Sequence, residues 1–146
     1  MVELTKQQTM KLSQYPFQTT DKVRYADTDR QGHVNNAVFN EFFETGRVEF
    51  LYLPERPLYM PGCSFVIANS KIDYLKEIKW PGIVQIGAAV VRIGNSSIHL
   101  IEAIYQDDKL VSTAEIVIVQ VNNKTTQSQP LSPETKEKLQ KFLLTE

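Results

Sequence analysis

The sequence predicts an α+β domain in which a five-stranded antiparallel sheet wraps around one long helix. Two observations predict this. In residues 35–53 the apolar side chains recur at steps of three and four, as on one face of a helix. Residues 63–121 then read as four long β segments joined by short turns, which is typical of an antiparallel sheet. The apolar face of a single helix must be covered, and the sheet is what can cover it.

The elements of the first half follow in order along the chain. Residues 1–16 are mostly polar and are expected to form an N-terminal arm, and a first strand is expected over 17–26. Asn35 or Asn36 is a suitable N-cap for the helix, which must end before Pro54.

The second half is expected to be β structure followed by a tail. Strands are predicted over 63–80, 83–93, 98–106 and 109–121, with Asp107-Asp108 as a hairpin turn. The tail, residues 122–146, is expected to contain a helix with Ser132 as its cap and Pro133 in its first turn. No repeat or low-complexity linker divides the chain, so residues 1–146 are interpreted as one domain.

Composition excludes several classes of function. A formal net charge of −1 gives no general attraction to nucleic acid or to an anionic membrane. One cysteine and two histidines argue against a disulfide framework and against a dedicated metal site. No apolar run approaches the roughly 20 residues of a membrane helix, and the N-terminus lacks the features of a secretory signal. We therefore expect a cytoplasmic protein.

A sheet with one covering helix leaves long strands with an edge or a face to protect. We therefore expect a homo-dimer or homo-tetramer, in which active sites are shared between subunits.

The join between the first strand and the helix carries an unusual amount of polar chemistry. It contains Asp27, Asp29, Gly32, His33 and the Asn35-Asn36 pair. Each could simply shape a loop or cap the helix. However, a helix N-terminus offers unpaired N–H groups that can hold an oxyanion, and an upstream carboxylate could act as nucleophile or general base. The turn thus contains both halves of an acyl-transfer site.

This stretch resembles the 4-hydroxybenzoyl-CoA thioesterase branch of the hotdog-fold superfamily. The motif runs through R-Y-x-D-T-D-x-x-G-H-V-N-N-A-x-F and on to F-x-E-x-x-R. Its residues here are Arg24, Tyr25, Asp27, Thr28, Asp29, Gly32, His33, Val34, Asn35, Asn36, Ala37 and Phe39, then Phe42 or Phe43, Glu44 and Arg47.

The resemblance implies a hotdog fold and a thioesterase that acts on an acyl or aryl thioester. It assigns the catalytic carboxylate to Asp29, as nucleophile or base, and the carbonyl-polarising N–H to the backbone of Asn36, with Ala37 as a neighbour. His33 is a further candidate, for orienting the carboxylate or for donating to the leaving group, and Gly32, Asn35 and Ala37 are expected to contact substrate.

Coenzyme A enters this scheme as part of the substrate, so no cofactor and no metal is expected. Its phosphates need basic or polar partners, for which Arg92, Ser96 and Lys124 are candidates.

Other carboxylates on the turn and the helix have alternative roles. Asp27 is expected to brace the turn. Glu41 and Glu44 are reserve catalytic candidates, because other hotdog thioesterases carry the carboxylate on this helix. Glu44 is more simply interpreted as a buried structural partner that can pair with Arg47.

The Asn35-Asn36 pair replaces the aromatic or His residues of the short-acyl and hydroxybenzoyl members, which leaves the acyl group open. Delivery of that group by coenzyme A or by an acyl carrier also stays open. Two other functions compete with hydrolysis: a non-catalytic acyl-thioester-binding protein and a hotdog hydratase or dehydratase.

Overall fold

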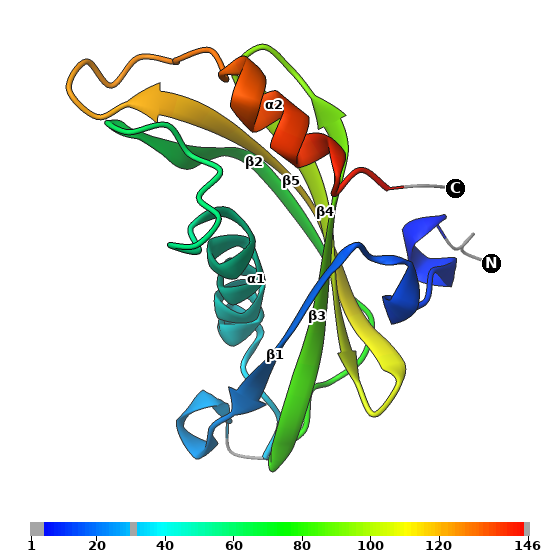
Figure 1. Cartoon of the computed structure of the whole chain (residues 1–146). Helices are drawn as coiled ribbons and strands as arrows, with labels where there is room; N and C mark the ends of the chain where they lie inside the picture. Colours follow the sequence, from blue (N-terminus) through cyan, green and yellow to red (C-terminus); the bar gives the residue numbers. More distant parts are fainter. Residues whose placement is uncertain (1–4, 30–31, 145–146) are drawn as a thin grey trace.

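Five antiparallel strands form one sheet that curves around a long helix in the computed structural model, which describes residues 5–29 and 32–144 (Figure 1). The elements are β1 (Phe17–Val23), α1 (Asn36–Leu51), β2 (Cys63–Tyr74), β3 (Gly82–Ile93), β4 (Ser97–Gln106), β5 (Lys109–Asn122) and α2 (Pro133–Gln140). The predicted fold class, including the C-terminal helix, is confirmed.

The strand order is β1-β3-β4-β5-β2. Strands β3, β4 and β5 are neighbours along the chain and in the sheet, as short turns require. Strand β2 instead crosses to the far edge and pairs with β5, from Cys63 opposite Asn122 to Tyr74 opposite Ser112. The two edges of the sheet are therefore β1 and β2.

Helix α1 begins where the side chain of Asn35 accepts a hydrogen bond from the N–H of Ala37 (3.0 Å). Its apolar face packs on the sheet and buries Phe39, Phe42, Phe43, Gly46, Phe50 and Leu51. Gly46 allows the closest approach, because a Cβ there would lie 2.7 Å from the side chains of both Ile86 and Glu102.

A buried contact between a carboxyl and a guanidinium group lies beneath α1. Glu102 on β4 is completely buried, and its Oε1 lies 3.2 Å from Nη1 of Arg47. Burial raises the pKa of Glu102 to about 8, although Arg47 acts in the opposite direction. The prediction that Glu44 is a buried partner of Arg47 is wrong: Glu44 is exposed, and Arg47 pairs with Glu102 instead.

Two predicted strands are shorter than expected. The strand expected over 17–26 ends at Val23, because the chain turns into a 3₁₀ segment at Tyr25–Asp27. The strand expected over 63–80 ends at Tyr74, because the next two N–H groups both donate to the carbonyl of Val111 and leave the regular ladder.

The N-terminal arm is more than a polar lead-in. Its described residues, 5–16, pack on the face of the sheet opposite α1 (Figure 1), where Met10 and Tyr15 join a small apolar cluster. The side-chain amide of Gln7 donates to the carbonyl oxygens of Glu102 (2.6 Å) and Ala114 (3.3 Å). No helix among the described residues is both long and apolar enough to cross a membrane.

Candidate active site

The turn before α1 is braced by Asp27. Its carboxylate is buried and accepts a hydrogen bond from the backbone N–H of Arg24 (2.8 Å). Its carbonyl accepts from the N–H of Asn35 (2.9 Å), which ties the turn to the start of the helix. Asp27 therefore has the structural role expected for it.

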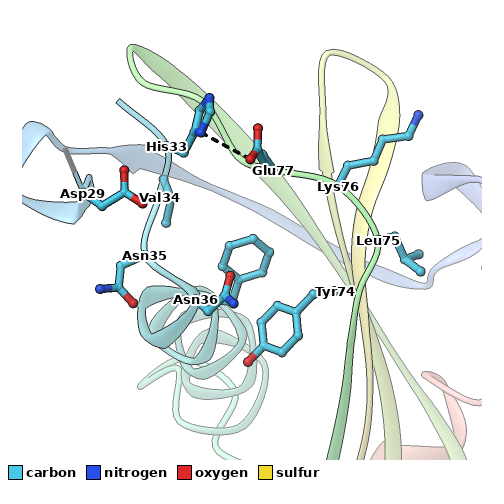
Figure 2. A pocket seen from close by; sticks show the side chains of 10 residues that line it. Asp29, His33, Val34, Asn35, Asn36, Tyr74, Leu75, Lys76 and Glu77 are labelled. Atoms are coloured by element: carbon cyan, nitrogen blue, oxygen red, sulfur yellow. Dashed lines mark ion pairs between the residues drawn. The ribbon is translucent and has the colours of Figure 1, made fainter. Parts of the chain in front are cut away.

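Asp29 lies two residues further on, in a short hairpin. Thr28 and Val34 form an antiparallel bridge, and the N–H of Asp29 donates to the carbonyl of His33 (2.9 Å). Gly32 closes this hairpin with φ of +76°, a conformation that favours glycine. The carboxylate of Asp29 lines a pocket of about 460 Å³ and points toward its interior (Figure 2).

The N-terminus of α1 forms the floor of the same pocket. The N–H of Ala37 is already engaged by the Asn35 side chain. The N–H of Asn36 donates to no acceptor in the described part of the chain, as expected for the first residue of a helix. The sequence analysis named the backbone N–H of Asn36, with Ala37 as its neighbour. Of these two N–H groups, that of Asn36 is therefore the one available to a substrate.

Residues after β2 form the opposite wall. Tyr74, Leu75, Lys76 and Glu77 line the pocket, and the N–H of Val34 donates to the carbonyl of Ile78 (2.9 Å), which holds the wall against the hairpin. Phe39 from α1 packs edge-on against Tyr74, with ring centroids 5.1 Å apart. The pocket is thus part polar and part apolar.

A second polar pair lies on the rim of the pocket. His33 Nδ1 and Glu77 Oε1 are 3.2 Å apart, and Figure 2 shows the two side chains turned toward each other. The local sequence does not predict that residues 33 and 77 lie close together. The signal that could have pointed to Glu77 was the polar stretch that interrupts the apolar pattern after Tyr74.

Other predicted site residues do not line the pocket. Gly32 and Ala37 contribute through the backbone, to the hairpin and to the first turn of α1. Arg92, Ser96 and Lys124 lie at the opposite end of the sheet, because Ile93 pairs with Ile98 there, whereas the pocket adjoins the end at which Tyr74 pairs with Ser112. The reserve candidates Glu41 and Glu44 are exposed on α1 and also do not line it.

Three lysines near the pocket were not predicted from the sequence. Lys76, Lys79 and Lys109 line a smaller pocket of about 250 Å³, which shares Lys76 and Glu77 with the first. No cluster of three or more His, Cys, Asp and Glu side chains suited to a metal occurs within residues 5–29 and 32–144.

Comparison with known proteins identifies thioesterases. A family model described as the thioesterase-like superfamily matches residues 23–139. The chain is 28% identical over 131 residues to the long-chain acyl-CoA thioesterase FadM of Escherichia coli (strain K12), covering 87% of this chain and 99% of FadM.

Two solved structures share both fold and sequence. A predicted thioesterase from Bacillus stearothermophilus is 27% identical with a TM-score of 0.79, over 89% of this chain and 98% of that one. A thioesterase from Thermus thermophilus, complexed with coenzyme A and Zn, is 27% identical with a TM-score of 0.74, over 86% of this chain and 93% of that one.

The family model covers most of the chain, including the whole of the turn that carries the pocket. The chain therefore belongs to the thioesterase-like superfamily.

Proposed function

We propose that this protein is an acyl-CoA thioesterase that hydrolyses an acyl or aryl thioester to the free acid and coenzyme A. The observation that carries the proposal is that the carboxylate of Asp29 and the available N–H of Asn36 belong to one pocket. Membership of the thioesterase-like superfamily and the similarity to FadM support the choice of substrate.

The proposed reaction uses the two groups on either side of the thioester carbonyl. The carbonyl oxygen accepts a hydrogen bond from the N–H of Asn36, where the positive end of the α1 dipole stabilises developing negative charge. Asn35 keeps this end of the helix in place by capping it. No group beyond the coenzyme A of the substrate itself is needed in this scheme.

Asp29 supplies the other half of the reaction. As a general base it takes a proton from water, whose oxygen attacks the carbonyl carbon. As a nucleophile it attacks the carbonyl carbon itself, and water then hydrolyses the acyl–Asp29 anhydride, which releases the acid and restores the carboxylate. In either route the carbon–sulfur bond breaks and the thiolate leaves toward the rim. There His33, whose Nδ1 lies 3.2 Å from Oε1 of Glu77, returns a proton to sulfur in this proposal.

A second copy of the chain is proposed to complete the site. Strand β2 is an edge strand, and Val66, Ile67 and Tyr74 on it are exposed to 45%, 52% and 46% in the single chain. Pairing between the β2 strands of two chains would cover these side chains. It would also give hydrogen-bond partners to the unpaired backbone N–H and C=O groups along the edge of β2. It would also bring a partner close to the pocket, whose wall continues directly from β2. The cytoplasmic location expected from the sequence stays a prediction.

The test of the chemistry is Asp29→Asn in a thiol-release assay with benzoyl-, hexanoyl- and palmitoyl-CoA. We expect kcat to fall by about 10³-fold, a magnitude typical of losing a general base, with the thermal midpoint unchanged. Asp108→Asn is a matched control, because it makes the same change in the turn between β4 and β5. The side chain of Asp108 does not line the pocket.

Near-native hydrolysis by Asp29→Asn would contradict the role of Asp29. The same assay separates the competing functions. A binding protein would retain acyl-CoA without releasing thiol, and a hydratase or dehydratase would interconvert hydroxyacyl- and enoyl-CoA.

A further inference from the structure

The geometry points to an anion site formed by Lys76, Lys79 and Lys109 that binds the phosphate groups of the coenzyme A moiety. This inference rests on the proposed thioesterase function and specifies which thioester the protein binds more tightly: one that carries phosphates, compared with a bare pantetheine thioester. The site joins the loop after β2 to the turn between β4 and β5.

The first reason is that three lysines line one pocket and form no ion pair in the described part of the chain. All three lysines are exposed and line one pocket of about 250 Å³. None of them forms an ion pair with any residue in the described part of the chain. Like charges placed together repel each other, so a multiply charged anion is the ligand that they would bind best.

The carboxylates of the same pocket do not cancel this charge. Glu77 lies on the wall shared with the candidate active site and faces His33 at 3.2 Å. Asp107 is the second carboxylate, in the turn between β4 and β5. Three ammonium groups against these two carboxylates leave an excess of positive charge.

The second reason is continuity with the active site. The two pockets share Lys76 and Glu77, so a ligand can extend from one to the other across the loop after β2. Figure 2 shows the side chain of Lys76 pointing away from Asp29 and Asn36, toward the neighbouring hairpin. In coenzyme A the pantetheine arm separates the thioester from the phosphates. A phosphate site must therefore adjoin the carbonyl site without coinciding with it.

The structure also holds the two sides of the site in fixed relation. The side chain of Gln106 accepts from the N–H of Lys79 and donates to its carbonyl, both at 2.9 Å. These bonds tie the loop of Lys79 to the end of β4, next to the hairpin that carries Lys109. The lysines therefore project from a braced backbone.

The experiment replaces the three lysines together by Gln (Lys76→Gln, Lys79→Gln, Lys109→Gln). The matched control removes three lysines at the other end of the molecule (Lys136→Gln, Lys138→Gln, Lys141→Gln), with the same change in net charge. A third variant with Arg at positions 76, 79 and 109 keeps the charge. Thermal unfolding verifies that each variant is folded.

Binding of coenzyme A and of adenosine 3′,5′-bisphosphate is measured by calorimetry at low and high salt. We expect the Gln variant to bind both at least about ten-fold more weakly and with a smaller salt dependence. The Arg variant and the control should bind like wild type. Unchanged binding in the Gln variant, an equal loss in the control, or no binding of coenzyme A by the wild type overturns the inference.

Kinetics separate this inference from the proposed function. The kinetic test uses Lys79→Gln with Lys109→Gln, because these two residues do not line the candidate active site. For hexanoyl-CoA this double variant should show a KM raised at least about ten-fold with kcat unchanged. For S-hexanoyl-pantetheine, which lacks phosphates, its KM should equal that of wild type. Hydrolysis of both substrates with no effect of the lysines would reject the anion site and leave the thioesterase intact. Binding of coenzyme A that depends on the lysines, without hydrolysis of any thioester, would reject the thioesterase function and leave the anion site intact. If the lysine substitutions change only the hydrolysis of acyl groups carried by an acidic carrier protein, the ligand is that protein and the inference fails.

Discussion

The imidazole of His33 and the carboxylate of Glu77 lie 3.2 Å apart on the rim of the candidate active site. The two residues come from opposite walls of the pocket, one from the hairpin before α1 and one from the loop after β2. A carboxylate at Nδ1 fixes the tautomer and orientation of an imidazole, so Glu77 is interpreted as a positioning residue for His33.

This relationship predicts that His33 and Glu77 act as a unit. Both His33→Ala and Glu77→Ala should lower kcat by about ten-fold, and the double variant should be no slower than either single one. The measurement uses S-hexanoyl-pantetheine, so that the charge of Glu77 beside the lysines does not affect substrate binding. Independent, multiplicative effects of the two substitutions would show that the pair does not act together.

The cap of α1 predicts a loss of both stability and activity in Asn35→Ala. Its side chain holds the N–H of Ala37, and loss of such a cap costs about 1 kcal/mol of unfolding free energy. The first turn that presents the N–H of Asn36 would fray, so kcat should fall as well.

Urea unfolding together with thiol release checks this prediction. Asn35→Asp should retain most of both properties, because Asp caps equally well. Asn40→Ala, at an exposed position of the same helix, is the control. If Asn35→Ala were as stable as wild type, the cap would have no energetic role.

Glu102 predicts how stability depends on pH. Because burial raises its pKa from 4.5 to about 8, the folded protein holds a proton between these values that the unfolded chain has released. Stability from this group is therefore complete below pH about 4.5 and is lost as the pH rises through about 8. The slope is at most about 1.4 kcal/mol per pH unit.

The measurement is the unfolding free energy of wild type and Glu102→Gln across this range. Gln keeps the shape of the side chain and cannot ionise. The unfolding free energy of the variant should therefore lack this slope, and its stability relative to wild type should rise toward alkaline pH. Identical pH dependence in both proteins would assign the slope to other groups.

The exposed edge of β2 predicts self-association. The wild type should sediment as a dimer or larger at micromolar concentration, and Ile67→Lys should shift it toward monomer, because a charge on an edge strand opposes pairing. Val48→Lys places the same charge at an exposed apolar position of α1 and is the control. A wild type that sediments as a monomer would remove the shared site from the proposed function.

Much of the fold could be predicted because its signals are local. The three- and four-residue spacing of the apolar side chains in 35–53 determines that α1 is a helix with one buried face, and Asn35 marks where it begins. The Asp107-Asp108 turn determines the β4–β5 hairpin. The turn that carries Asp29 and Asn36 is also continuous in sequence, and so both halves of the proposed site could be recognised before folding.

What only the tertiary structure decided depends on contacts between distant residues. Strand β2 crosses to the far edge of the sheet, and this crossing brings Glu77 to His33 and Lys76 to the pocket; no local pattern encodes it. The same sheet register carries Arg92 and Lys124 to the other end, although their charge had made them reasonable partners for phosphate. Burial under α1 also determines that Arg47 pairs with Glu102 rather than with Glu44, three residues away. The sequence by itself determined the helix, the strands and the chemistry of one turn, because each depends on neighbours along the chain. The walls of the pocket and its cations depend on which strands pair, and the packing of the whole sheet decides that.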